Sequence, residues 1–206
     1  GPGHRAPSRR AEGPRRVTDR RTALLVAAVD EIARNGTRGL RIEGVAKRAG
    51  VSPALIYHHF GDRSTLLQSA LEHIGEQANA YTEHIEGNSR ENLLAGLIDE
   101  IQDEVSVRTN SAAWGELRDT AIFDQGLRPT IAALTQRWVA DIADLIRSGQ
   151  HDGSIAVALD PEEMGVRLSA LVEGISARWL TGILTTEQAR AHLTAMAVAM
   201  LGPARR

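Results

Sequence analysis

Three adjacent side chains, Tyr57, His58 and His59, have the clearest capacity for chemistry in this sequence. They stand between Ile56 and Phe60, which lie within about 40° of each other in a helix of about 100° per residue and therefore face inward together. His58 then points the opposite way, with Tyr57 and His59 on the two flanks. The outward centre of such a helix can reach base edges in a DNA major groove, and its flanks can reach phosphates. A solvated helix surface is the alternative, but two histidines and a tyrosine suit that purpose poorly.

The segment that precedes this row has the spacing of a helix-turn-helix. Ala46 supplies a small contact, Gly50 follows four residues later in the turn, and Ile56 closes against Ala46 six residues after that. A tight turn between two helices needs a small residue facing the partner helix and a residue that tolerates a positive φ. Val45 and Val51 complete a miniature core. Helix pairs with such turns also occur in proteins that bind no nucleic acid, so the spacing alone leaves the function open.

Hydrophobic periodicity predicts an all-α chain of about nine helices, arranged as a small head and a larger body. The expected helices span residues 18–35, 42–49, 53–60, 62–85, 90–107, 110–123, 126–149, 161–181 and 186–201. Residues 154–159 are the one candidate strand, and no internal repeat is visible. We expect a disordered basic arm at residues 1–16, a helix-turn-helix DNA-binding domain at residues 17–63, and a helical body at residues 64–206.

The charge is divided unevenly between head and body. Residues 1–63 hold 13 Lys and Arg against 6 Asp and Glu, a net charge of +7, whereas the remaining residues hold 11 against 20, a net charge of −9. A basic head on an acidic body favours a polyanion as the partner of the head, although a basic solvated tail gives the same counts. Arg15, Arg16, Arg20 and Arg21 are candidates to enter a minor groove, and a solvated tail is again the alternative.

The composition argues against several classes of protein. The chain has no cysteine, which excludes disulfides, thiolate metal sites and cysteine nucleophiles. Its single lysine, Lys47, lies inside the predicted helix-turn-helix, and no glycine-rich phosphate loop follows a strand, so we expect no enzyme activity and no cofactor. His73 with Glu76 and Gln77 is better explained by a solvated helix face than by a metal site. No stretch approaches the roughly 18 apolar residues of a membrane helix, and we expect a cytoplasmic protein.

The head also carries a specific family pattern. It consists of residues 45–52 (VAKRAGVS), residues 56–60 (IYHHF), Arg63 and the leucines at 66–67. From Thr18 to Leu67 the chain resembles the DNA-binding domain of the TetR (tetracycline-repressor) family. Residues 171–182 resemble, more weakly, the dimerisation helix of many members.

The resemblance implies a sequence-specific transcriptional regulator. It would bind a pseudo-palindromic operator as a homodimer, most often as a repressor, and a small-molecule effector in the C-terminal body would modulate it. Tyr57, His59 and Arg63 would hold the DNA backbone, while Leu55 and His58 would read bases. The family's DNA-contact positions are occupied by Ser52, Pro53, Ala54, Leu55, Tyr57, His58, His59 and Arg63.

Three residues depart from the family pattern. Arg41 stands where a Thr or Ser helix cap is usual, and it adds a candidate phosphate contact. Gly44 replaces a residue that is usually charged, at a cost of about 1 kcal/mol in helix propensity. Leu55 replaces a small residue, commonly Thr or Ser, and can touch a thymine methyl group. These departures bear on the sequence preference rather than on the mode of binding.

The body offers two further expectations. Apolar stripes on the last two helices favour a four-helix dimer interface, with an internal core face as the alternative. The expected interface residues are Leu168, Leu171, Val172, Ile175, Arg178, Trp179, Leu193, Met196 and Met200. The resemblance also implies an effector pocket, for which Tyr81, Trp114, Arg118 and Trp138 are candidates, although each type is more often core or surface. A helical adaptor protein that never binds DNA is the competing class for the whole chain.

Overall fold

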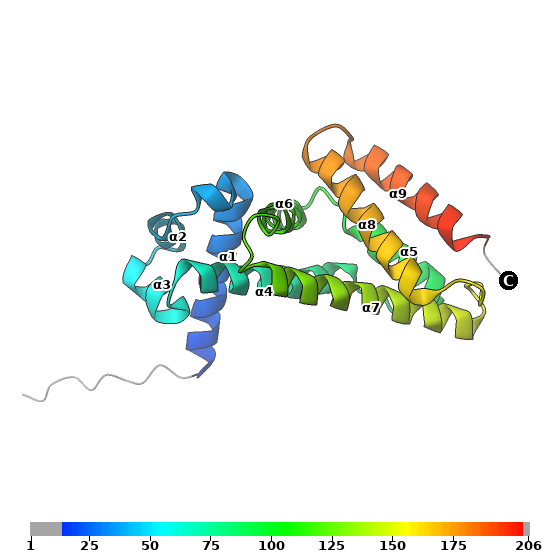
Figure 1. Cartoon of the computed structure of the whole chain (residues 1–206), viewed down its shortest axis with the longest axis horizontal. Helices are drawn as coiled ribbons and strands as arrows, with labels where there is room; N and C mark the ends of the chain where they lie inside the picture. The colour runs from blue at the N-terminus through cyan, green and yellow to red at the C-terminus, as the bar shows by residue number, and fades with distance from the viewer. Residues whose placement is uncertain (1–13, 204–206) are drawn as a thin grey trace, which may run out of the picture.

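The computed structural model describes the backbone of residues 14–203 and the side chains of residues 19–203. Over this range the chain forms nine α-helices and no strand, which confirms the predicted all-α class. The helices are α1 (Pro14–Gly39), α2 (Ile42–Ala49), α3 (Pro53–Phe60), α4 (Arg63–Thr82), α5 (Ser89–Asp99), α6 (Val105–Thr120), α7 (Arg128–Asp152), α8 (Pro161–Leu180) and α9 (Thr186–Leu201). Figure 1 shows α1, α2 and α3 gathered at one end and the paired α8 and α9 toward the other.

The head is built around four apolar side chains of α2 and α3. Val45, Ala46, Ile56 and Phe60 are each at most 4% exposed. They pack with buried residues of α1, α4 and α6, among them Leu24, Ala28, Ile32, Leu66, Ala70 and Leu117. The head, which includes α1, therefore shares one hydrophobic core with α4 and α6 of the body.

The turn between α2 and α3 has the geometry that its sequence predicts. Gly50 adopts φ 68° and ψ 34°, a left-handed conformation that glycine enters without steric cost. The Gly50 amide donates to the Lys47 carbonyl at 3.3 Å and the Val51 amide to the Ala46 carbonyl at 3.0 Å, which is the Schellman pattern. Ser52 directly precedes α3, and its side chain makes no capping hydrogen bond.

The first helix differs from its prediction at both ends. It begins at Pro14 rather than Thr18, so residues 14–16 of the expected disordered arm are helical, while residues 1–13 lie outside the described range. At the other end the expected stop at Gly36 is a kink, with φ 68° and ψ 173°, after which one more turn follows.

The boundary between the predicted helices at residues 90–107 and 110–123 lies earlier in the chain than expected. α5 ends at Asp99 and α6 begins at Val105. Ile101, between them, is completely buried in the core of the body. No glycine or proline lies at this break. We attribute the break to the burial of Ile101 and not to a local turn signal.

The candidate strand at residues 154–159 is a loop. The amide of Ile155 donates to the Gly149 carbonyl at 2.9 Å, and the Gln150 side chain donates to the carbonyls of Ala156 and Leu159 at 3.1 and 2.8 Å. These groups from α7 satisfy the loop backbone, so no neighbouring strand is required.

The body holds a second core between α5, α7, α8 and α9. Its largest member, Trp179, is 1% exposed and donates its indole N–H to Thr186 Oγ1 at 2.9 Å. α4 connects the two cores. It begins after Asp62, whose carboxylate caps the helix by accepting a hydrogen bond from the Thr65 amide at 2.7 Å. Among the described helices, none is both long and apolar enough to cross a bilayer.

Candidate nucleic-acid interface and internal cavity

One side of α3 faces solvent along its whole length. Tyr57 is 49% exposed and His58 is also exposed, whereas Ile56 and Phe60 are buried. Of the other expected contact residues on this segment, Ser52, Pro53 and Ala54 are exposed, and Leu55 and His59 are half-buried. The inward and outward sides that the sequence predicts are therefore confirmed, while contact with DNA stays a prediction.

The charge state of His59 is set by its neighbours. Partial burial lowers the pKa of this imidazole, and the nearby positive charges of His58 and Arg21 lower it further. His59 is thus mainly neutral at pH 7, with one nitrogen able to donate and the other to accept a hydrogen bond.

Arg21 lies against α3 and α4 rather than reaching outward. Its guanidinium carbon is 5.0 Å from the centroid of the Phe60 ring, and its Nη2 donates to Ser69 Oγ at 3.3 Å. The side chain is nevertheless exposed, and its minor-groove role stays a prediction. Arg15 and Arg16, which share that expectation, lie outside the described side chains.

Two further candidate phosphate ligands are engaged with the backbone near the end of α1. Arg63 donates a hydrogen bond to the Thr37 carbonyl. Arg41 donates to the Arg38 carbonyl at 3.1 Å and, more weakly, to the Leu40 carbonyl at 3.4 Å. Both side chains are exposed, and each guanidinium keeps further N–H donors that can reach a phosphate oxygen while the carbonyl contact is kept.

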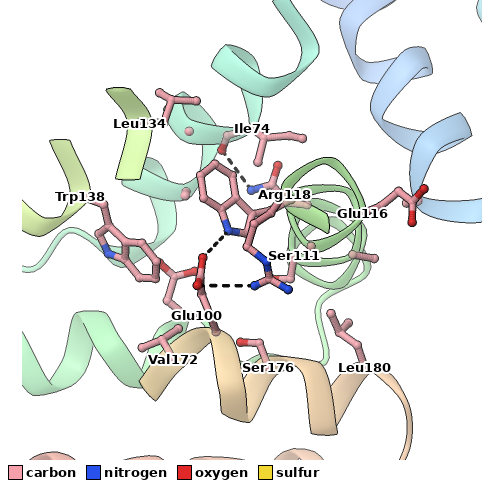
Figure 2. A pocket seen from close by; sticks show the side chains of 18 of the residues that line it. Ile74, Glu100, Ser111, Glu116, Arg118, Leu134, Trp138, Val172, Ser176 and Leu180 are labelled. Carbon is pink, nitrogen blue, oxygen red and sulfur yellow. Dashed lines mark hydrogen bonds and ion pairs between the residues drawn. The ribbon is translucent and has the colours of Figure 1, made fainter. Parts of the chain in front are cut away.

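The body contains a cavity of about 670 Å³ that opens to solvent, and it is lined by residues of α1, α4, α6, α7 and α8 together with Glu100 and Thr181. All four candidate effector residues, Tyr81, Trp114, Arg118 and Trp138, line this one cavity. Figure 2 shows Trp138 of α7 and Arg118 of α6 approaching this space from two different helices. This volume is in the range of small-molecule sites.

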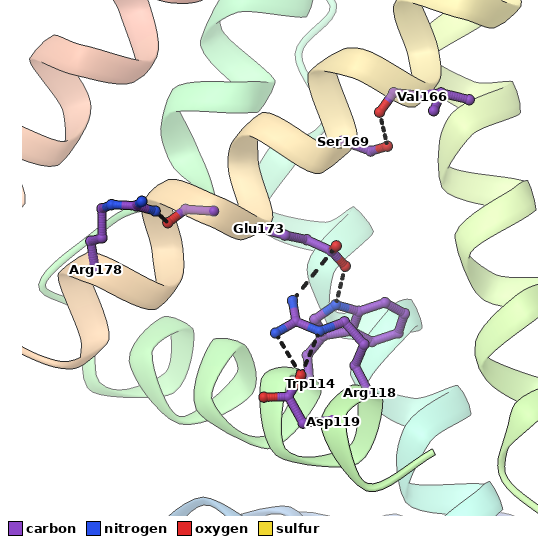
Figure 3. A network of polar contacts seen from close by, with 8 residues as sticks. Trp114, Arg118, Asp119, Val166, Ser169, Glu173 and Arg178 are labelled. Atoms are coloured by element: carbon purple, nitrogen blue, oxygen red, sulfur yellow. Dashed lines mark hydrogen bonds and ion pairs between the residues drawn. The ribbon is translucent and has the colours of Figure 1, made fainter. Parts of the chain in front are cut away.

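Arg118 and Trp114 are held in place by carboxylates. The Trp114 indole N–H donates to Glu173 Oε1 at 3.0 Å, and Arg118 Nη1 lies 3.6 Å from Glu173 Oε2. Arg118 also donates two hydrogen bonds to Asp119 Oδ1, at 2.9 and 3.0 Å (Figure 3). Because its charge is already balanced, Arg118 is poorly suited to bind an anionic ligand.

The most informative cavity residue, Glu100, was missed by the sequence analysis. Burial raises the pKa of its carboxyl to about 8. Within the described residues, no hydrogen bond or ion pair reaches this carboxyl. Asn110 donates to the neighbouring Tyr81 hydroxyl at 3.1 Å, and burial also raises the pKa of Tyr81.

Carboxylates dominate the charge of the cavity wall. Seven carboxyl side chains and two arginines line it. The carboxyl groups belong to Glu72, Glu76, Glu100, Glu116, Asp119, Asp141 and Glu173. In the sequence these residues look like ordinary solvated helix faces, so only the fold reveals their convergence. The wall as a whole favours a positively charged occupant.

Most residues expected at the dimer interface lie inside the chain itself. Leu168, Val172, Ile175, Trp179 and Leu193 are at most 8% exposed, because α8 and α9 turn this side toward α5 and α7. Leu171 and Met200 are half-buried against the same core, and Arg178 and Met196 are exposed. The first five are therefore core residues of the chain, and their place at a dimer interface is not supported.

The head and body together define a helix-turn-helix transcriptional regulator. Residues 24–70 match the family described as bacterial regulatory proteins of the tetR family. Residues 89–202 match the C-terminal region of BetI-type transcriptional repressors. The chain belongs to the TetR family of transcriptional regulators, which is a family of regulators and not of enzymes.

Individual relatives agree with this assignment. The transcriptional regulator UidR of Escherichia coli K12 is 24% identical over 172 residues, covering 82% of this chain and 84% of UidR. A TetR-family regulator from Rhodococcus sp. is 44% identical, with a TM-score of 0.85, covering 90% of this chain and all of that structure. A regulator from Saccharomonospora viridis, solved in complex with choline, is 26% identical with a TM-score of 0.76, covering 92% and 100%.

Proposed function

We propose that this chain is a homodimeric repressor that binds a pseudo-palindromic operator through α3 and releases it when an organic cation fills the cavity. The observation that carries the DNA-binding part is the exposed side of α3, where Tyr57 and His58 stand on a helix fixed by Ile56 and Phe60. A short, rigid helix with an outward polar side is the element that enters a major groove. We expect it to act on the chromosome in the cytoplasm.

A second copy would cover the outer side of α8 and α9. Small and apolar residues occupy this side, and the largest, Val166, Met196 and Val198, are 57%, 48% and 39% exposed. Its small members are Ala170, Ala191, Ala195 and Ala199, all exposed. Small side chains let two helices approach closely, and a two-fold axis through this side would form a four-helix bundle. Two heads are then available for two half-sites.

The cavity supports an organic cation as the effector. Glu100 is a half-buried residue whose carboxyl has no hydrogen bond or ion pair from the described residues, and Trp114, Trp138 and Tyr81 line the same space. Aromatic faces attract cations, most strongly where water is excluded, and a quaternary ammonium group suits such a site. The choline complex of the Saccharomonospora viridis regulator is consistent with this ligand class.

Selection of bound duplexes from a random pool tests the proposal, because it reports DNA binding, symmetry and spacing together. We expect two inverted half-sites about one helical turn apart, and loss of the complex when choline or a tetraalkylammonium ion is added. Operator placement across a promoter, with transcription restored by the cation, would establish repression. A pool that yields no enriched sequence would instead favour a helical adaptor that does not use DNA.

A further inference from the structure

The kink in α1 is held by residues of two other helices. Thr37, directly after Gly36, is 2% exposed, and all its polar groups have partners. Its amide and hydroxyl donate to Glu116 Oε1 at 2.7 and 2.9 Å, and its hydroxyl also lies 2.7 Å from Thr120 Oγ1. Its carbonyl accepts a hydrogen bond from Arg63. One buried residue thus connects α6 with the beginning of α4.

Each end of this connection lies at a functional surface. Glu116 lines the cavity and is carried on α6 beside Trp114 and Arg118. Figure 2 shows Glu116 at the side of α6 that faces α1, away from Trp138. Arg63 is the first residue of α4 and follows the end of α3 by only three residues. The contacts therefore run from the cavity wall to the end of the helix proposed to enter DNA.

The backbone at the kink is adapted to this contact. A Cβ atom at Gly36 would lie 3.0 Å from Glu116 Oε1, and the φ of 68° is one that side-chain-bearing residues rarely adopt. Glycine thus allows the carboxylate to approach the main chain. A hydrogen bond to a charged acceptor is stronger than a neutral one, and a buried donor left without it carries the full cost of desolvation. These properties suit a fixed connection rather than an incidental surface contact.

We propose that Glu116, Thr37 and Arg63 are the positioning residues through which the occupant of the cavity sets the position of α3. A ligand that displaces Trp114 or Arg118 moves α6 and with it Glu116, and the hydrogen bonds to Thr37 carry that displacement to Arg63. When Thr37 shifts, Arg63 loses its carbonyl partner and the junction between α3 and α4 loosens. This inference rests on the proposed function for its ligand and its DNA, but the connection itself can be tested without either.

Hydrogen exchange on the full chain, without DNA or ligand, tests the connection. We expect Glu116→Ala to speed exchange of the amides in residues 61–66 by about tenfold or more, the effect of losing one charged hydrogen bond. Glu116→Gln keeps an oxygen acceptor and should stay within about threefold of wild type. Glu72→Ala, a change at an exposed carboxylate of the same cavity wall on α4, is the control. Unchanged exchange in α8 would show that the body stays folded.

Unchanged exchange of residues 61–66 in both Glu116→Ala and Thr37→Val would overturn the proposal.

The second measurement is the ratio of duplex affinities without and with choline. Thr37→Val loses the hydroxyl contacts with Glu116 and Thr120 but keeps both backbone hydrogen bonds, so it should lower this ratio in part while the choline affinity of the DNA-free protein stays within about twofold. If wild-type protein binds no duplex or shows a ratio of one, the proposed function fails, and the exchange result still decides on the connection. A full wild-type ratio in Thr37→Val, with normal choline binding, would refute the coupling alone.

Discussion

Cation binding in the cavity should depend steeply on pH, because its central carboxyl is mostly uncharged at neutral pH. Burial raises the pKa of Glu100 from its ordinary value of 4.5 to about 8. With that pKa, about 1% of the protein carries a charged Glu100 at pH 6, about 9% at pH 7 and about 90% at pH 9. If the cation binds the charged form, its affinity should rise by about 90-fold from pH 6 to pH 9, with a plateau above the pKa.

The variant Glu100→Gln removes this dependence while keeping the size of the side chain. We expect its cation affinity to be nearly independent of pH, close to wild type at pH 6 and about 10- to 100-fold weaker at pH 9. Titration calorimetry with choline and a tetraalkylammonium series measures both, and Glu72→Gln, an exposed carboxylate of the same wall, should keep the wild-type slope. A flat wild-type profile, or a slope that persists in Glu100→Gln, would refute the reasoning.

The same shift has a consequence for stability. A folded-state pKa above the unfolded value means that the folded protein binds the proton more tightly. The stabilisation is complete below about pH 4.5 and is lost as the pH rises through about 8. Ligand-free protein should therefore lose thermal stability between pH 7 and pH 9, and Glu100→Gln should lose much less. Equal losses in the two proteins would place the titrating group elsewhere.

Three further perturbations test the other surfaces. Leu55→Ala and His58→Ala should each reduce discrimination between the selected duplex and a mismatched one by about 1–3 kcal/mol in binding assays, while non-specific affinity changes little. Undiminished discrimination would mean that another face of the head reads the bases. Met196→Asp should shift the protein from dimer to monomer in sedimentation experiments, because it places a charge at the proposed interface, where Met196 is 48% exposed. A dimer that persists would contradict that assignment. Gly50→Ala should lower the free energy of unfolding by about 1 kcal/mol, because the φ of Gly50 is 68°. Gly115→Ala should raise the free energy of unfolding, because Gly115 lies inside α6 and, like Gly50, has no neighbouring atom within 4 Å of an added Cβ. A change of the same sign in both variants would refute the argument.

The head could be predicted closely because its determinants are local. Ala46, Gly50 and Ile56 are separated by four and six residues, and the turn they form depends on neighbouring backbone bonds. The break between α5 and α6 could not be predicted in this way. It depends on the burial of Ile101 against helices that come later in the chain.

The candidate sites show the same difference between local determinants, which the sequence reveals, and contacts between distant residues, which it does not. Aromatic residues such as Trp114 and Trp138 were found because their type suits a cavity wall, but the partner of Trp114, Glu173, lies 59 residues away in sequence. The expected interface failed for a related reason. Periodicity shows that α8 has an apolar stripe, and Leu168 and Val172 belong to it, but periodicity does not say whether that stripe meets the chain's own core or a second copy.

The most direct test of the central claim is the duplex affinity of the purified protein as a function of salt, starting at low ionic strength. We predict tight binding that weakens steeply as salt rises, because phosphates neutralised by the head release counterions. The combined variant of Tyr57→Phe and His58→Ala should bind more weakly at every salt concentration. A protein that ignores every double-stranded oligonucleotide at about 50 mM salt would contradict the claim that α3 enters DNA.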